Sequence, residues 1–150
     1  MKKQILSIVA ALSILTTLTV TGFAHLDSRV TADIPFDFMV GETKLPAGKY
    51  TVEPFSPRDT LVIRSRETGA IAVFQVNNDR TENGKTQAKL IFNRYGAQTF
   101  LSQIWDGYNK VGQKLGRSRA EREAAKKSGD QIVSNTAGPE SITVLAQRGQ

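Results

Sequence analysis

Few side chains in this sequence could catalyse a reaction. The only histidine is His25, and no cysteine occurs. Histidine acid–base catalysis, Ser-His or thiol nucleophiles, and metal sites ligated by histidine or cysteine therefore lack their essential groups. No glycine-rich phosphate motif of the GxxxxGK[ST] or GxGxxG type occurs either. The sequence predicts no catalytic residue, no metal site and no cofactor.

Paired carboxylates are the remaining catalytic option, because glycoside hydrolysis needs only two of them. Asp33 and Asp37 share one face of a predicted strand, but four residues of strand separate them by roughly 13 Å. That separation exceeds the spacing required for either stereochemical course. Both would need partners from other strands, such as Glu53 or Asp106. The alternative interpretation is that these acids solubilise an exposed face and discourage edge pairing.

Cations are concentrated in one segment near the C-terminal end. Between residues 110 and 127, seven lysines and arginines face two glutamates, which gives a net charge of +5. Such a segment can bind an anionic envelope polymer, anionic lipid headgroups or an acidic protein partner. The candidate contacts are Lys114, Arg117, Arg119 and Arg122. The structural alternative is a solvated helix whose charges keep the protein soluble.

Aromatic side chains form a second candidate group. Trp105 and Tyr108, near Tyr95 and Phe100, could stack on a sugar or an apolar ligand. Phe100 and Trp105 have opposite parity on one predicted strand, so they cannot both face one pocket without a β-bulge. The structural alternative packs Phe100 in the core and leaves Trp105 as a half-buried cap.

The N-terminal residues predict where these side chains would act. Two lysines precede an uncharged stretch from Ile5 to Val20, and Gly22 and Ala24 are small residues where signal peptidase cleaves. We therefore expect an exported protein, periplasmic or extracellular, for which nucleic acid is not an expected partner. The alternative is an uncleaved anchor, since the uncharged stretch is long enough to span a bilayer. Cleavage would leave no membrane span.

Strand patterns dominate the mature chain. Residues 30–40 alternate between an apolar face and a polar face that holds Asp33 and Asp37, while Pro35 indicates an edge or a bulge. Further strands are predicted over 49–55, 60–66, 71–76, 87–95 and 99–105. Segment 71–76 is apolar on both parities, which predicts a central strand, and Asn83-Gly84 predicts a hairpin that pairs it with 87–95. This pattern is typical of an all-β fold, either an antiparallel sandwich or a small barrel.

The C-terminal part follows a different pattern. Ser118-Arg119-Ala120-Glu121 has the form of a capping box and predicts a short, exposed helix from Arg119 to about Lys127. Alternation over 140–147 indicates a last strand that can return to the sheet. The predicted organisation is a signal peptide (1–24), a β domain (25–109), a basic segment with the helix (110–127) and a polar tail with the last strand (128–150).

Five segments carry a further pattern. They are Ile34-Pro35-Phe36-Asp37-Phe38, Leu45-Pro46-Ala47-Gly48-Lys49-Tyr50, Phe92-Asn93-Arg94-Tyr95-Gly96, Phe100-Leu101-Ser102-Gln103-Ile104-Trp105 and Ser118-Arg119-Ala120-Glu121-Arg122-Glu123. In these segments the chain resembles a family of short exported bacterial proteins of unknown function. The resemblance implies export and carries over no activity, ligand or catalytic residue.

Together these observations favour an exported, non-catalytic domain that binds or organises envelope or extracellular material. The alternative is a carboxylate-dependent glycan hydrolase or lyase of the cell envelope. Two acids brought together in one cleft would favour the hydrolase, whereas a binding domain needs none.

Signal cleavage can be tested directly. We expect processing between Ala24 and His25, because Gly22 and Ala24 match the small residues that signal peptidase requires. N-terminal sequencing of the exported protein should then begin at His25. Exported protein that still begins at Met1 would contradict the prediction.

Overall fold

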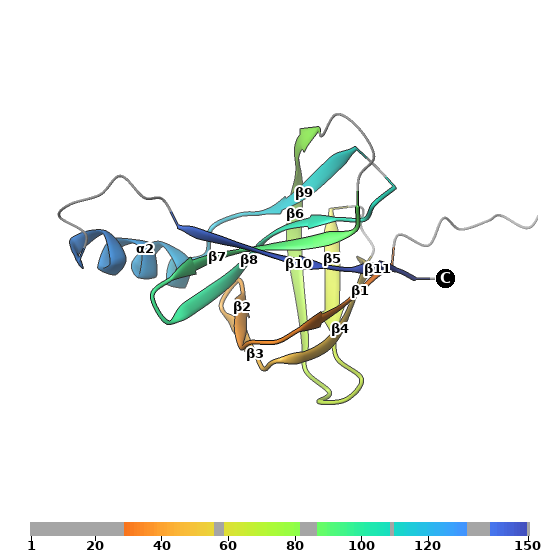
Figure 1. The fold of residues 1–150 in the computed structure, drawn as a ribbon, viewed down its shortest axis with the longest axis horizontal. Helices are drawn as coiled ribbons and strands as arrows, with labels where there is room; N and C mark the ends of the chain where they lie inside the picture. Colours follow the sequence, from red (N-terminus) through yellow and green to blue (C-terminus); the bar gives the residue numbers. More distant parts are fainter. Residues whose placement is uncertain (1–28, 56–58, 82–86, 109, 132–138, 150) are drawn as a thin grey trace, which may run out of the picture.

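The computed structural model describes residues 29–55, 59–81, 87–108, 110–131 and 139–149. In these residues eleven strands form one sheet, accompanied by one helix near the C-terminal end (Figure 1). The strands are β1 (Val30–Ile34), β2 (Phe38–Val40), β3 (Thr43–Leu45), β4 (Gly48–Phe55), β5 (Thr60–Arg64), β6 (Ile71–Thr81), β7 (Lys89–Tyr95), β8 (Gln98–Trp105), β9 (Val111–Leu115), β10 (Glu140–Leu145) and β11 (Gln147–Arg148), and the helix is α2 (Arg119–Gln131).

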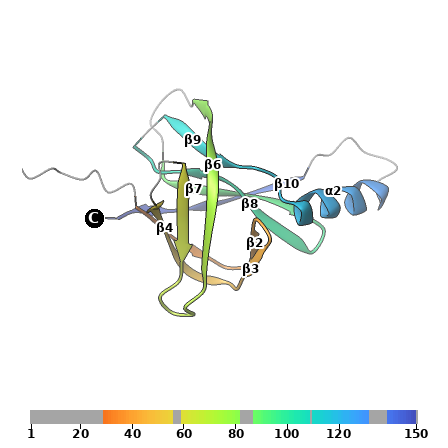
Figure 2. The same ribbon diagram turned by 180° about the vertical axis from the view of Figure 1, so that it is seen from behind.

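The sheet is antiparallel along the order β10-β7-β8-β9-β6-β5-β4-β1-β11. Strand β2 lies off this path and pairs antiparallel with β3 and in parallel with β8. Strands β5 and β6 run across the direction of β7, β8 and β10 (Figures 1 and 2), so the sheet bends around a core. The prediction of a mainly all-β, antiparallel fold is confirmed. Instead of two packed sheets or a closed barrel, the strands form one open, bent sheet.

The two ends of the sheet meet in the C-terminal segment. Strand β10 pairs with β7 at one end, and β11 pairs with β1 at the other. Only Ala146 separates β10 from β11, and its N–H donates to the carbonyl of Ala88 at 2.9 Å. The last strand expected from the sequence alternation is therefore present, and it links both ends of the pairing order.

The alternation over 30–40 has the predicted consequence for burial. Val30, Ala32 and Ile34 are buried, as is Phe38, whose ring packs edge-on against Tyr50 with centroids 5.1 Å apart. The strand is interrupted after Ile34, because the next residue is a proline, which has no N–H to donate to a neighbouring strand.

The acids on the other face are exposed, as predicted, and Asp37 has a structural role. Its Oδ1 accepts a hydrogen bond from the N–H of Ala47 at 3.1 Å, and its Oδ2 lies 3.2 Å from Lys44 Nζ. The Ala47 N–H, followed by Lys44, holds the pKa of Asp37 below its ordinary value. Asp37 therefore ties the β3–β4 turn to the β1–β2 connection.

The predicted hairpin between 71–76 and 87–95 is wrong. Strand β6 pairs with β5 and β9, whereas β7 pairs with β8 and β10. Strand β9, which the sequence analysis did not predict, lies between β6 and β8. The Asn83-Gly84 pair lies outside the described residues. Strand β6 is central as predicted, but the outward side chains of Ile71 and Val73 are 56% and 55% exposed.

Strand β9 lies inside the segment that the sequence analysis assigned to the basic region. It fits there because Gly112 leaves room for the indole ring of Trp105 on β8. A Cβ atom at Gly112 would lie 2.6 Å from both Cε2 and Cζ2 of that ring. The close approach of strand and ring makes glycine necessary at this position.

This packing predicts that replacing Gly112 by alanine lowers the stability of the protein, whereas the same replacement at Gly116 does not. Gly112→Ala should destabilise the protein by about 1–3 kcal/mol, because the new methyl group overlaps the ring of Trp105. Gly116→Ala is the matched control, since a Cβ there meets nothing within 4 Å. Urea denaturation of both variants provides the measurement. Equal stability of the two would show that Trp105 does not pack on Gly112.

Candidate binding site

A β-bulge in β8 organises the outer face of the sheet. Ile91 pairs with Gln103 and Phe92 pairs with Leu101, so Ser102 is an extra residue on β8. The shift reverses the alternation of side chains along β8. Phe100 and Trp105, opposite Asn93 and Lys89 respectively, therefore lie on the same face of the sheet. The sequence pattern predicts that these two aromatics can share a face only with such a bulge.

The aromatics on this face are mostly buried. Phe100 is 1% exposed and packs against Tyr95 with ring centroids 6.0 Å apart. Trp105 is 3% exposed, its Nε1 donates to Gln103 Oε1 at 3.3 Å, and Lys89 Nζ lies 5.0 Å from the ring centre. Trp105 is therefore fully buried and not the half-buried cap considered from the sequence, so it offers little surface to a ligand. Tyr108 is exposed, with the guanidinium of Arg148 4.8 Å from its ring.

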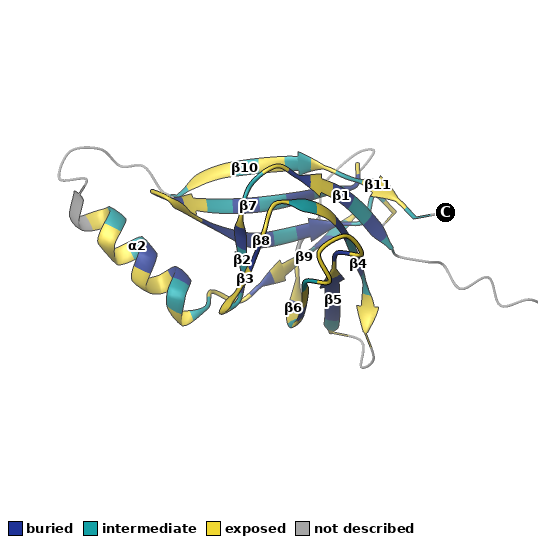
Figure 3. Ribbon diagram, turned by 90° about the horizontal axis from the view of Figure 1, so that it is seen from below, coloured by how far each residue is buried: buried dark blue, intermediate teal, exposed yellow. Residues whose placement is uncertain are grey.

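Helix α2 lies against the end of this face, and most of its side chains are exposed (Figure 3). Its buried Ala124 packs in the cluster of Tyr95 and Phe100. The N–H of Glu121 donates to Ser118 Oγ at 3.1 Å, which confirms the predicted N-cap. The helix extends to Gln131, beyond the predicted end near Lys127.

The carboxylate of Glu121 does not complete the capping box. It points into the protein, where Oε1 accepts hydrogen bonds from Asn93 Nδ2 at 3.0 Å and from the Tyr95 hydroxyl at 3.2 Å. Glu121 is 5% exposed. Burial and the neighbouring Glu121 carboxylate raise the pKa of Tyr95, so its hydroxyl stays protonated and donates. Another acid, Glu42, occupies the helix N-terminus and accepts from the N–H of Arg119 at 2.7 Å.

Beside this network lies a cleft of about 460 Å³, which we call the amide cleft. Side chains from four strands and from the chain leading to α2 contribute to it. Its lining consists of Asn77, Asn78, Asn93, Ser102, Gln103, Lys114, Leu115, Gly116, Arg117 and Pro139. Neutral amides and two cations dominate this set. Both cations are among the binding residues predicted from the sequence, whereas none of the four amides is a predicted binding residue.

The four predicted cations therefore fall into two pairs. Lys114 and Arg117 line the amide cleft. Arg119 lies on the exposed side of α2, where its Nε is 2.9 Å from Glu123 Oε1, and this partner raises the pKa of Arg119. The Nη1 of Arg122 donates to the backbone carbonyl of Arg117 at 2.9 Å. Only the first pair is brought together with other groups that can bind a ligand.

Hydrogen bonds define what Asn93 can offer in the amide cleft. A carboxylate can only accept, so the Asn93 amide must point its NH₂ group toward Glu121. The same Nδ2 donates to Ser102 Oγ at 3.2 Å, which occupies its second hydrogen. The group that Asn93 has left for a ligand is its carbonyl oxygen, an acceptor. The cleft thus combines an acceptor suited to hydroxyl groups with cations suited to anionic groups.

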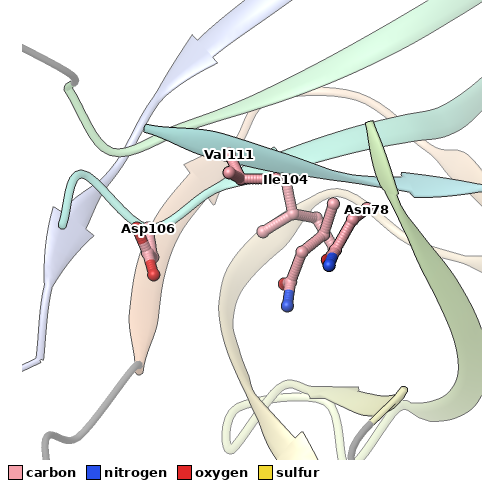
Figure 4. Close-up of a pocket in the computed structure, with 5 residues that line it drawn as sticks. Asn78, Ile104, Asp106 and Val111 are labelled. Atoms are coloured by element: carbon pink, nitrogen blue, oxygen red, sulfur yellow. The ribbon is translucent and has the colours of Figure 1, made fainter. Parts of the chain in front are cut away.

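A second, smaller cleft of about 270 Å³ is lined by Asn78, Ile104, Asp106, Val111 and Gln113. Figure 4 shows Asp106 on one side and Asn78 on the other, with Ile104 between them. Asp106 Oδ1 accepts from the N–H of Tyr108 at 2.8 Å. Asp106 is the only carboxylate among the residues that line this cleft. The geometry provides no acid pair at this position.

The acids considered for hydrolysis do not converge. No two of the four acids Asp33, Asp37, Glu53 and Asp106 line the same one of the three clefts described in this article.

Within the described ranges, no group of three or more acidic, histidine or cysteine side chains could hold a metal ion. In the same part of the chain, no helix is long and apolar enough to cross a membrane. The predicted signal peptide, residues 1–24, lies outside the described residues.

Comparison with known proteins finds no family model, no curated protein and no solved structure that matches this chain. The site must therefore be interpreted from its own geometry. Its amides come from β6, β7 and β8, and only pairing brings those strands together. The sequence signal for the amides was indirect: Asn93 and Gln103 lie in the segments that carry the resemblance described above, as do their neighbours Ser102 and Glu121.

The Glu121 network can be tested against a second glutamate of the same helix. Glu121→Gln should destabilise the protein by about 1–3 kcal/mol, because the donors of Asn93 and Tyr95 lose their shared charged acceptor. Glu123→Gln, with the same change of charge at an exposed position, should have a much smaller effect. Thermal and urea unfolding provide the measurement. Similar losses in both variants would contradict a special role for Glu121.

Proposed function

We propose that this protein is an exported, non-catalytic binding domain and that its amide cleft binds an anionic polymer of the cell envelope. The observation that carries the proposal is the convergence of Lys114 and Arg117 with Asn93 and other amides in one cleft. Polymers of acidic sugars present hydroxyl groups and anions together. Amide and guanidinium groups are the side chains that bind such a combination.

The arrangement around the cleft supports binding by a preformed site. Asn93 is oriented by Glu121 and Ser102, so its carbonyl oxygen need not be ordered by the ligand. Sites held in their bound geometry lose less conformational entropy when a ligand arrives. The cations add an attraction that acts before contact and that salt weakens.

A carboxylate-dependent hydrolase or lyase has less support. Among the residues that line the amide cleft, none is an acid. Glu53 lines a different cleft, where Arg29 and Arg64 both contact its carboxylate. Both oxygens of that carboxylate contact a guanidinium group, so Glu53 serves the ion pairs of its own cleft.

The test compares two double variants with the same change of charge. Lys114→Gln with Arg117→Gln removes the cations of the cleft, and Arg119→Gln with Lys126→Gln removes two exposed cations of α2 outside it. Each lost hydrogen bond to a charged group contributes about 1.5–3 kcal/mol, so the first variant should bind polygalacturonate at least about tenfold more weakly. The second variant should bind nearly as the unmodified protein does. Calorimetric titration in 0.05–0.3 M salt provides the affinities.

Two further measurements separate the outcomes. Neutral dextran should not bind, since it lacks the anionic groups that Lys114 and Arg117 would contact. Binding of polygalacturonate should weaken as salt rises beyond about 0.15 M, because the attraction between charges more than about 8 Å apart is then largely screened. Equal losses in both double variants would indicate diffuse attraction to a basic surface and would contradict a specific cleft.

A further inference from the structure

A second cationic cleft lies on the outer face of β1, β4 and β5. Its volume is about 420 Å³, and we call it the arginine cleft. The lining consists of Arg29, Thr31, Lys49, Thr51, Glu53, Arg64, Arg66, Glu67 and Gly149. Four of these residues are cations and two are acids. This site was not predicted from the sequence, because its cations are spread over nearly forty positions of an almost neutral stretch.

Glu53 holds two of the arginines together. Its Oε2 lies 3.2 Å from Arg29 Nε, and its Oε1 contacts Arg64 Nη2. The side chain of Glu53 is 13% exposed, whereas those of Arg29 and Arg64 are 38% and 47% exposed. The carboxylate therefore lies beneath the two guanidinium groups. A ligand arriving from solvent meets the cations first.

The C-terminal segment completes the site by supporting Arg29. The N–H of Gly149 donates to the carbonyl of Arg29 at 2.7 Å. A Cβ atom at Gly149 would lie 2.9 Å from the Arg29 side chain, so that side chain packs directly on the glycine backbone. Two contacts, one with Glu53 and one with Gly149, thus orient Arg29 before any ligand binds.

The chemistry of the lining indicates the kind of ligand. Glu53 neutralises part of the charge of Arg29 and Arg64, and Lys49 and Arg66 add two further cations in the same cleft. Guanidinium groups present several N–H donors in one plane, which match the oxygens of a phosphate group. The hydroxyls of Thr31 and Thr51, whose Oγ1 atoms lie 3.5 Å apart, can donate to the same oxygens.

We propose that the arginine cleft is a binding site for a phosphate group, distinct from the amide cleft. The group could belong to a soluble phosphorylated polymer or to a phospholipid headgroup, and both present the same oxygens to the arginines. The proposal does not depend on the function of the amide cleft, because the two clefts share no lining residue.

The test uses pyrophosphate as a soluble probe and vesicles containing phosphatidylglycerol as a lipid probe. Lys49→Gln with Arg66→Gln should weaken pyrophosphate binding about tenfold or more, because two charged donors are lost. Both residues are exposed, so the variant should fold. Lys126→Gln with Lys127→Gln, on exposed positions of α2, is the control with equal change of charge and should keep its affinity. Nuclear magnetic resonance should show the Nε signals of Arg29 and Arg64 shifting with pyrophosphate.

Each outcome bears on the proposal. Pyrophosphate binding that only the Lys49 and Arg66 variant loses supports the site. If the unmodified protein binds the vesicles and the same variant does not, the lipid headgroup is the source of the phosphate group. If the unmodified protein binds pyrophosphate but not the vesicles, the ligand is a soluble phosphorylated molecule. Failure to bind pyrophosphate, or equal losses in both variants, would overturn the proposal. Those results would leave the polygalacturonate experiment on the amide cleft unaffected.

Discussion

The buried carboxylate of Glu121 is the constraint on which the outer face of this protein depends. Buried acids are usually found in ion pairs, but the donors to the Glu121 carboxylate are the neutral groups of Asn93 and Tyr95. A carboxylate removed from water must be satisfied by hydrogen bonds, because desolvation would otherwise cost several kcal/mol. The first turn of α2 is thereby held on β7, and the position of the helix sets the position of the chain that leads into it.

The bulge at Ser102 has an equally wide effect. One extra residue on β8 lets Leu101 and Ile104 both face the core, while Phe100 and Gln103 face outward. Without that shift the strand would place part of its apolar set in solvent, because a change of register by one residue exchanges the faces. The bulge also brings Ser102 to Asn93, so the same irregularity packs the core and shapes the wall of the amide cleft.

The charges of the protein are distributed differently in space than in sequence. The segment from 110 to 127 carries a net charge of +5, yet six of its seven cations are divided between the wall of the amide cleft and helix α2. Conversely, Arg29, Lys49 and Arg64 are far apart in sequence and meet in one cleft. Pairing of β1, β4 and β5 in register produces this second cluster, since it aligns outward positions of three strands. Local charge density was therefore an incomplete guide to where an anion can bind.

Local features of the chain were predictable wherever the cause was local. The alternation over 30–40, the cap at Ser118 and the last strand near the C-terminus all follow from neighbouring residues, through side-chain parity or a hydroxyl acceptor. Pro35 was expected to mark an edge or a bulge, but the chain there is divided into β1 and β2, and β1 pairs on both sides. The mainly β character follows from the same patterns. Charge counting also pointed to Lys114 and Arg117, two of the residues that line the amide cleft.

Tertiary structure decided which strands pair, and with them the sites. A turn motif favoured pairing of β6 with β7, but β9 inserts between β6 and β8, and β7 turns to β8 and β10. The choice depends on burial summed over distant segments, which a turn of a few residues cannot encode. The sequence by itself determined most of the strands, though not β9, together with the cap and the basic segment. Only the folded sheet decided that Glu121 faces inward, that Ser102 is a bulge and that dispersed arginines share one cleft, because each depends on contacts between residues far apart in the chain.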